Sequence, residues 1–109
     1  MEERLFQEKC DVAMLALRKK LLNLSDQFPF EVEGEGEKLE LLFEDADETR
    51  FVISPNSAAR QIWISALTTS FKLSFSDQAQ SFVLDKTGET LDALMGRILT
   101  QQLGEAVTV

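Results

Sequence analysis

Residues 30–53 read FEVEGEGEKLELLFEDADETRFVI, and the spacing of apolar residues in this stretch decides the fold. Its large apolar side chains recur at every second position in three short runs: Phe30 and Val32, then Leu39, Leu41 and Phe43, then Phe51 and Ile53. Alternate side chains of a β-strand point to opposite faces, so this period indicates strands with one buried face. The intervening segments, 34–37 and 44–48, are short and rich in glycine and acidic residues, which is typical of hairpin turns. The stretch therefore predicts a three-stranded antiparallel meander.

The same alternation continues in the following part of the chain. It recurs in three further runs: Ile62, Ile64 and Ala66; Phe71, Leu73 and Phe75; and Phe82 and Leu84. Each run has the length of an ordinary strand, and polar residues alternate with the apolar ones. We therefore expect an antiparallel sheet of about six strands.

Helical periodicity flanks these strands on both sides. Before them, one apolar stripe recurs at steps of three and four: Phe6, Cys10, Ala13, Met14, Leu17, Leu21 and Leu24. A second stripe follows them and ends at a glycine suited to stop a helix: Leu91, Leu94, Met95, Ile98, Leu99, Leu103 and then Gly104. We expect the basic residues 18–20 near the negative end of the first helix dipole.

Both helices can bury their stripes only against the apolar face of the sheet. The sequence therefore predicts an α+β fold, a two-layer α/β sandwich. Its N- and C-terminal helices pack on one face of an antiparallel sheet of about six strands. We expect a single domain over residues 1–109.

Composition excludes many classes of function. The chain has 109 residues, no histidine, one cysteine and a net charge of -8. Without histidine there is no Ser-His-Asp triad or Cys-His dyad, and one cysteine cannot form a zinc or iron-sulfur site by itself. An acidic chain repels phosphate backbones and anionic lipids, so we expect neither a nucleic-acid nor a membrane partner. The opening residues 1–4 lack the character of a targeting peptide, and we expect a cytoplasmic protein.

The negative charge is concentrated in one segment of the chain. Residues 31–48 contain nine acids and only one base, Lys38, which gives -8, while the remaining 10 acids and 10 bases cancel. Alternation puts Glu31 and Glu33 on one face of the first strand, and the second hairpin gathers further carboxylates: Glu44, Asp45, Asp47 and Glu48. Such oxygen ligands suit hard cations held weakly, without a rigid cage. The alternative is a solvated acidic edge that maintains solubility and blocks strand pairing between molecules.

Trp63 is the strongest candidate for a contact with another protein. If Ile62 and Ile64 face the helices, alternation puts Trp63 on the solvent side, between Gln61 and Ser65. An exposed tryptophan is a common anchor in protein interfaces. The alternatives are that a loop covers the indole or that the strand register is shifted by one residue.

These features together resemble the frataxin family, especially its bacterial CyaY-type members. The resemblance extends over essentially the whole chain and rests on the order of elements and four segments: 51–53 (FVI), 61–65 (QIWIS), 85–90 (DKTGET) and 100–105 (TQQLGE). It implies a small iron-binding protein without a catalytic site. Such a protein regulates iron-sulfur cluster assembly by docking on the complex of cysteine desulfurase and scaffold protein.

The resemblance also implies roles for individual residues. Trp63 and Gln61 match the family's exposed patch for partner binding, and Arg60 falls beside them. The residues that match the family's iron-binding ridge are Glu3, Asp11, Glu31 and Glu33. Where the family usually has further acids late in the first helix, this chain has residues such as Arg18, Lys19 and Leu22. We therefore expect weak binding of ferrous or ferric iron, away from this basic segment.

A rival hypothesis from another class is an acidic chaperone or adaptor of the secretion type. Such proteins are also small and acidic with terminal helices, but they bind protein clients and normally dimerise. The frataxin resemblance instead leads us to expect a monomer. A dimer with a broad apolar surface would favour the chaperone hypothesis.

Overall fold

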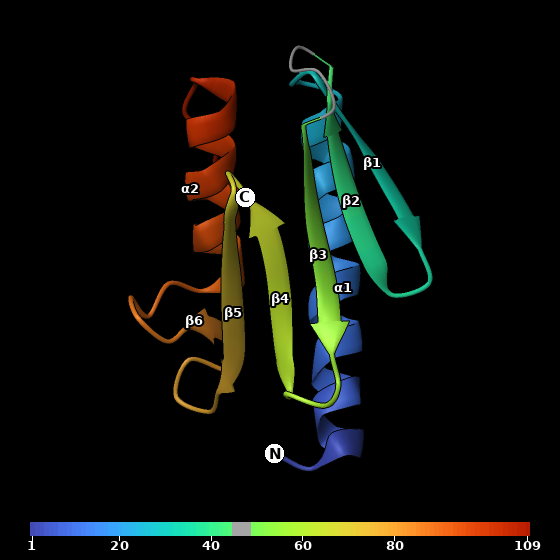
Figure 1. The fold of residues 1–109 in the computed structure, drawn as a ribbon, viewed down its shortest axis with the longest axis vertical. Coiled ribbons are helices and arrows are strands. Elements are labelled where there is room, and N and C mark those ends of the chain that lie inside the picture. Colours follow the sequence, from blue (N-terminus) through green and yellow to red (C-terminus); the bar gives the residue numbers. More distant parts are fainter. Residues whose placement is uncertain (45–48) are drawn as a thin grey trace.

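The computed structural model describes residues 1–44 and 49–109, and it shows two helices and six strands (Figure 1). In chain order the elements are α1 (Glu3–Ser25), β1 (Phe30–Glu35), β2 (Lys38–Phe43), β3 (Arg50–Asn56), β4 (Gln61–Ala66), β5 (Thr69–Ser76), β6 (Ser81–Leu84) and α2 (Leu91–Leu103). The predicted order of helix, six strands and helix is confirmed.

The strands form one antiparallel sheet in which each strand pairs with its neighbour in sequence, in the order β1-β2-β3-β4-β5-β6. A two-residue turn, residues 36–37, joins β1 to β2, and Gly36 there has a φ of 65°. A positive φ at this point matches the right-handed twist of the paired strands, and glycine adopts it without strain. The turn fixes the register, so that Phe30 lies opposite Phe43.

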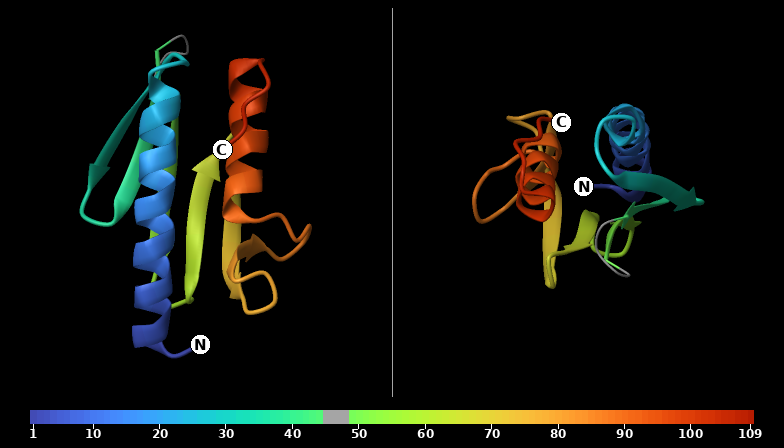
Figure 2. Two further views of the ribbon diagram at one scale, coloured as in Figure 1. Left: turned by 180° about the vertical axis from the view of Figure 1, so that it is seen from behind. Right: turned by 90° about the horizontal axis from the view of Figure 1, so that it is seen from above.

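Both helices cover the same face of the sheet (Figure 2). The core between the two layers is apolar throughout, and among the described residues no polar or charged side chain is buried in it. Phe82 packs edge-on against Phe6 of α1 at 5.9 Å and against Phe75 of β5 at 5.3 Å between ring centroids. One aromatic cluster therefore joins the first helix to the last two strands.

The ends of the helices show how local sequence limits each element. Thr90 is the N-cap residue of α2, and its side chain accepts a hydrogen bond from the Ala93 backbone N–H at 3.2 Å. The helix ends, as predicted, at Gly104, which has a left-handed φ of 73°. α1 runs to Ser25, and its last turn carries no basic residue. The expectation that residues 18–20 lie at its negative end is wrong, because the apolar stripe extends to Leu24 and continues the helix.

The segment after α2 folds back along the helix. Val107 is buried, and its backbone N–H donates to the Thr100 hydroxyl at 2.9 Å. Gly96 permits this approach, because a Cβ there would lie 3.2 Å from the Val107 carbonyl oxygen. No helix among the described residues combines the length and apolar character needed to cross a membrane.

Two neighbouring residues of α1 test this layered packing. Phe6 is fully buried, whereas Leu5 is 41% exposed on the other side of the helix. We expect Phe6→Ala to lower the free energy of unfolding by about 3–5 kcal/mol. The matched control Leu5→Ala should change it by less than about 1 kcal/mol. Urea denaturation monitored by circular dichroism measures both, and equal effects would contradict the packing.

Candidate functional site

Trp63 lies on the sheet face opposite the helices, as predicted, and its side chain is 37% exposed. It occupies the third position of β4, between the buried residues Ile62 and Ile64. Backbone pairing places Ser54 of β3 on one side of it and Lys72 of β5 on the other. Nearby, Ser65 lies between Val52 and Ser70. The indole is therefore at the centre of a largely polar sheet surface.

Neighbouring side chains hold the indole in place. The Trp63 ring N–H donates to Gln61 Oε1 at 2.9 Å, and the Gln61 amide donates to the Ser74 hydroxyl at 3.2 Å. Lys72 Nζ lies 4.8 Å from the centroid of the indole ring, within the range of a cation–π contact. An aromatic side chain fixed in this way loses little further conformational entropy when it binds a partner. Ordering of the indole in advance makes it a suitable anchor.

A shallow depression of about 320 Å³ adjoins the indole, lined by Val52, Ser54, Ser65, Ser70, Lys72 and Trp63 among others. Gln61, Trp63 and Ser65 thus share one surface, as predicted. Arg60 is different: it has a left-handed φ of 56° in the turn before β4, and its guanidinium donates to the Ser57 carbonyl oxygen of that turn. Its side chain is bonded to its own turn and not to the indole.

The partners of Trp63 were only partly predictable from the sequence. Alternation puts Lys72 and Ser74 on the solvent face of their strand, since they flank the buried residue Leu73. Which residue of β5 pairs with Trp63 depends on the register, and that depends on the β4–β5 turn. The turn contains Leu67 and Thr68, which have φ values of 53° and 60°. These residue types seldom adopt such angles, so the sequence gives no signal for the turn.

A pair of carboxylates forms where α1 meets the β1–β2 turn. Gln7 Nε2 donates to Asp11 Oδ1 at 2.8 Å and to Glu37 Oε1 at 2.7 Å, so one amide group holds both acids. Both acids are exposed. Sequence reasoning selected Asp11 and missed Glu37 and Gln7, because only folding brings the turn beside the helix. This is the place where the structure gathers carboxylates from separate elements.

Glu31 and Glu33 lie exposed on β1, at the edge of the sheet. Glu33 is opposite Glu40 of β2, and Glu40 pairs with Lys38 at 3.5 Å and with Arg50 at 3.6 Å. Two bases therefore offset part of the negative charge beside Glu33. The acidic edge at Glu31 and Glu33 is present, but Glu40 on the neighbouring strand forms ion pairs with Lys38 and Arg50.

The other predicted metal ligands are dispersed. Glu3 lies in the first turn of α1, two helical turns before Asp11. The Arg18 guanidinium lies beside Gly34, near the end of β1. A Cβ built on Gly34 would be only 2.9 Å from it. In the part of the chain that the structure describes, no group of three acidic or cysteine side chains is placed to hold a metal ion. Glu44 is exposed, and the hairpin candidates Asp45, Asp47 and Glu48 lie outside the described residues.

Cys10 is buried in the core and free. The pKa of its thiol is raised to about 12, chiefly because burial removes the thiolate from water and in smaller part because of the nearby carboxylates of Glu37 and Asp11. The side chain is therefore a neutral thiol at physiological pH. A neutral buried thiol is a poor metal ligand, so Cys10 acts as a small apolar core residue.

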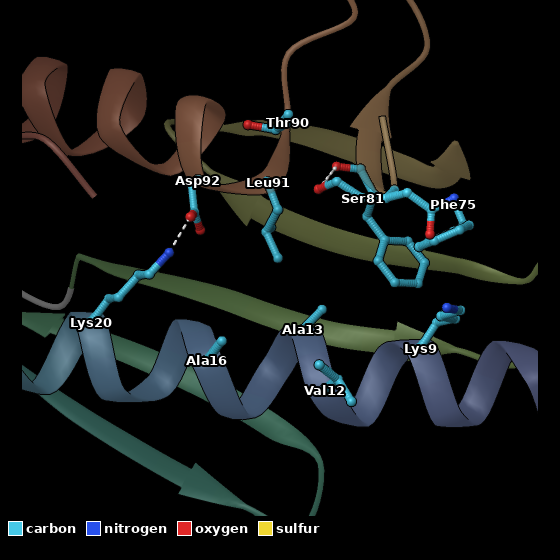
Figure 3. Close-up of a pocket in the computed structure, with 12 residues that line it drawn as sticks. Lys9, Val12, Ala13, Ala16, Lys20, Phe75, Ser81, Thr90, Leu91 and Asp92 are labelled. Atoms are coloured by element: carbon cyan, nitrogen blue, oxygen red, sulfur yellow. Dashed lines mark hydrogen bonds and ion pairs between the residues drawn. The ribbon is translucent and has the colours of Figure 1, made fainter. Parts of the chain in front are cut away.

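The helix side of the molecule has a groove of about 430 Å³ between α1, the start of α2 and the last two strands (Figure 3). Its α1 wall carries the small residues Ala13 and Ala16, with Lys9 at one end and Lys20 at the other. Lys20 forms an ion pair with Asp92 of α2. Its lining combines apolar side chains such as Val12 and Phe75 with polar ones such as Gln80 and Ser81.

Fold and site together define a small α+β sandwich whose bare sheet face presents one fixed tryptophan. A model of the frataxin-like domain matches residues 1–105, and the chain belongs to this family. Two relatives are iron-sulfur cluster assembly proteins named CyaY. That of Pseudomonas fluorescens is 24% identical over 80% of this chain and 79% of its own length. That of Stutzerimonas stutzeri is 29% identical over 71% and 68%.

The fold has a close counterpart among solved structures. Frataxin from Psychromonas ingrahamii, studied for stability modulation within the CyaY protein family, superposes with a TM-score of 0.77. The match covers 99% of this chain and 97% of that one, at 18% sequence identity. The two-layer sandwich is therefore the frataxin fold, and the sequence identifies a bacterial CyaY-type frataxin.

Because the pKa of Cys10 is raised in the folded state, the free energy of unfolding decreases at alkaline pH. The unfolded thiol ionises near its ordinary pKa of 9.0 and the folded one near 12, so the stability due to the neutral thiol is complete below pH 9 and is lost progressively above it. Between pH 9 and 10, we expect wild type to lose about 1 kcal/mol of unfolding free energy relative to Cys10→Ala. Urea titrations at both pH values measure the difference, and parallel curves would contradict this assignment.

Proposed function

We propose that this chain is a non-catalytic regulator of iron-sulfur cluster assembly that docks on the complex of cysteine desulfurase and scaffold protein. The observation that carries the proposal is the indole of Trp63, held by Gln61 and Lys72 on a sheet face that no helix or strand of residues 1–44 and 49–109 covers. The family membership of residues 1–105 and the names of the CyaY relatives support the pathway.

Docking would use two surfaces of different character. The sheet face offers an aromatic anchor surrounded by hydroxyl and amide groups, which suits a partner surface with an apolar pocket and a polar rim. The edge formed by Glu31 and Glu33 offers negative charge, which increases the rate of encounter with a basic surface. Affinity would therefore depend chiefly on Trp63, and the salt dependence of association on the acidic edge.

Iron binding, in this proposal, is weak and involves surface carboxylates. The Asp11 and Glu37 pair supplies two oxygen ligands already held close together by Gln7. Glu31 and Glu33 add negative potential along the neighbouring strand, while Arg18 disfavours a cation on the late part of α1. Two carboxylates without a rigid cage give low affinity and little discrimination between hard cations.

Replacement of Trp63 tests the docking surface. We expect Trp63→Ala to weaken binding to the desulfurase and scaffold complex by about 2 kcal/mol or more, roughly thirtyfold. Trp63→Phe should lose less, because an aromatic ring remains. Gln101→Ala, an exposed change on α2, is the matched control and should leave binding unchanged. Calorimetry measures affinity, and urea denaturation checks that each variant stays folded; full affinity of folded Trp63→Ala would sink the docking proposal.

An anaerobic titration with ferrous iron tests the carboxylate pair. Paramagnetic broadening of backbone amide signals should begin around Gln7, Asp11 and Glu37, and the double variant Asp11→Asn/Glu37→Gln should remove it there. Glu105→Gln, a lone exposed acid, serves as the control. Calcium in excess should displace the iron because the ligands are few and the site is open. Broadening centred on residues 18–23, or iron that excess calcium does not displace, would contradict this assignment.

The chaperone hypothesis has one supporting feature, the largely apolar groove between the helices. It predicts client binding on the helix side, insensitive to Trp63→Ala and blocked by a bulky change such as Ala16→Trp. The same binding measurements therefore distinguish the two classes, since docking through the sheet face has the opposite pattern.

A further inference from the structure

The outward side of α1 carries an apolar stripe whose side chains are exposed in the described structure. Four large hydrophobic side chains are exposed there: Leu5 by 41%, Val12 by 71%, Leu15 by 57% and Leu22 by 43%. With the two charged residues between them they define the outer stripe, Leu5, Glu8, Val12, Leu15, Lys19 and Leu22. A helix that lies on the surface of a monomer ordinarily has a polar outer side.

The spacing of the outer stripe is that of a helix-packing seam. Its members are separated by three, four, three, four and three residues, the heptad pattern by which one helix packs along another. At 100° per residue the stripe lies roughly opposite the buried stripe of α1, which includes Phe6, Leu17 and Leu21. Figure 2, seen from behind, shows α1 with no other segment in front of it. The stripe is thus accessible along its whole length.

The outer stripe is complementary to itself when reversed. Consider a second α1 packed antiparallel, with a two-fold axis between Ala13 and Met14. Leu5 then faces Leu22 of the partner subunit, and Val12 faces Leu15 of the partner subunit. Glu8 faces Lys19 of the partner subunit, so opposite charges meet as well. A parallel arrangement would instead place Glu8 against its own copy and Lys19 against its own copy.

Charge along α1 favours the same orientation. Residues 3–13 contain three acids and two bases, which gives -1, and residues 14–25 contain three bases and no acid, which gives +3. An antiparallel pair places the negative half of each helix against the positive half of the other, whereas a parallel pair places +3 against +3. A second α1 packed antiparallel therefore fits the outer stripe in three respects: the apolar spacing, the contact of Glu8 with Lys19, and the charge of the two helix halves.

We propose that the outer stripe of α1 binds a second copy of this chain in an antiparallel, two-fold symmetric pair. Each copy carries a net charge of -8, so the pair is weak at low ionic strength and becomes tighter as salt screens the repulsion between the acidic segments. The expected monomer is thus the dilute form. Trp63 lies on the other side of the sheet, so the pair leaves the docking surface free.

Sedimentation velocity from about 10 μM to about 1 mM tests this proposal. Wild type should associate to a dimer, and Val12→Glu should weaken association at least about tenfold, because it buries a charge against Leu15 of the partner subunit. Glu8→Lys and Lys19→Glu should each weaken it about tenfold, since each turns two symmetric attractions into repulsions. Lys86→Glu, an exposed change remote from α1, is the control. Circular dichroism verifies that all variants fold.

The two charge variants, each alone and then mixed, decide the orientation. Glu8→Lys carries two lysines in the stripe and Lys19→Glu carries two glutamates, so each repels itself and attracts the other. The mixture should form a heterodimer within about threefold of the wild-type affinity. Failure of the mixture to associate overturns the antiparallel pairing. So does a mixture that binds much more tightly than wild type while each variant alone associates as wild type does, since a parallel pair would have that pattern. The proposal is overturned if wild type stays monomeric over the whole concentration range, or if Val12→Glu leaves the dimer unaffected. It is also overturned if the chain stays monomeric and binds a different protein through the outer stripe.

Discussion

One constraint governs this structure: both helices must bury their apolar stripes, and only one face of the sheet is apolar. The sheet is a simple meander in which every strand alternates between the two faces. The inner face and the two helices together exclude water from the core, with Phe82 in contact with both Phe6 and Phe75. In the part of the chain that the structure describes, the outer sheet face and the outward side of α1 are left uncovered as a result. Both proposed interaction surfaces are consequences of this one-sided burial.

Periodic features of the sequence were sufficient to predict the layers. A period of two placed Ile62 and Ile64 inside and Trp63 outside, and each lies where the pattern put it, because a shift of one residue would have buried the wrong set. The helices followed from a period of 3.6, and Gly104 stops α2 as predicted. The stripe to Leu24 is confirmed, and only the position of residues 18–20 was misjudged, because they precede the last turn of α1. Propensity and charge act weakly at a helix end, whereas burial of Leu24 contributes more.

Sequence periodicity could not predict the contacts between segments that lie far apart in the chain. The acids of residues 31–48 were evident as a block, yet the useful pair joins Asp11 to Glu37 through Gln7, and Glu40 is occupied by two bases. Arg60 adjoins Gln61 in sequence, but its left-handed backbone turns the side chain toward Ser57. Both results depend on turn geometry and register. A single sequence specifies these through packing of the whole chain and not through any local pattern.

The two free surfaces differ in how they restrain their side chains, and this difference bears on their roles. On the sheet face, the backbone is fixed by pairing on both sides of β4, and the Trp63 side chain is fixed by Gln61 and Lys72. On α1, the leucine and valine side chains of the outer stripe project from a helix whose other side is firmly packed. The first surface is ordered before it binds, which favours specific recognition of one partner. Binding at the second surface is stabilised chiefly by removing apolar area from water. Any helix of matching spacing could bury that area equally well, so the charged residues of the outer stripe must select the partner. Reversal of the stripe brings Glu8 opposite Lys19, and this selection by charge is what makes a second copy a better fit than an arbitrary amphipathic helix.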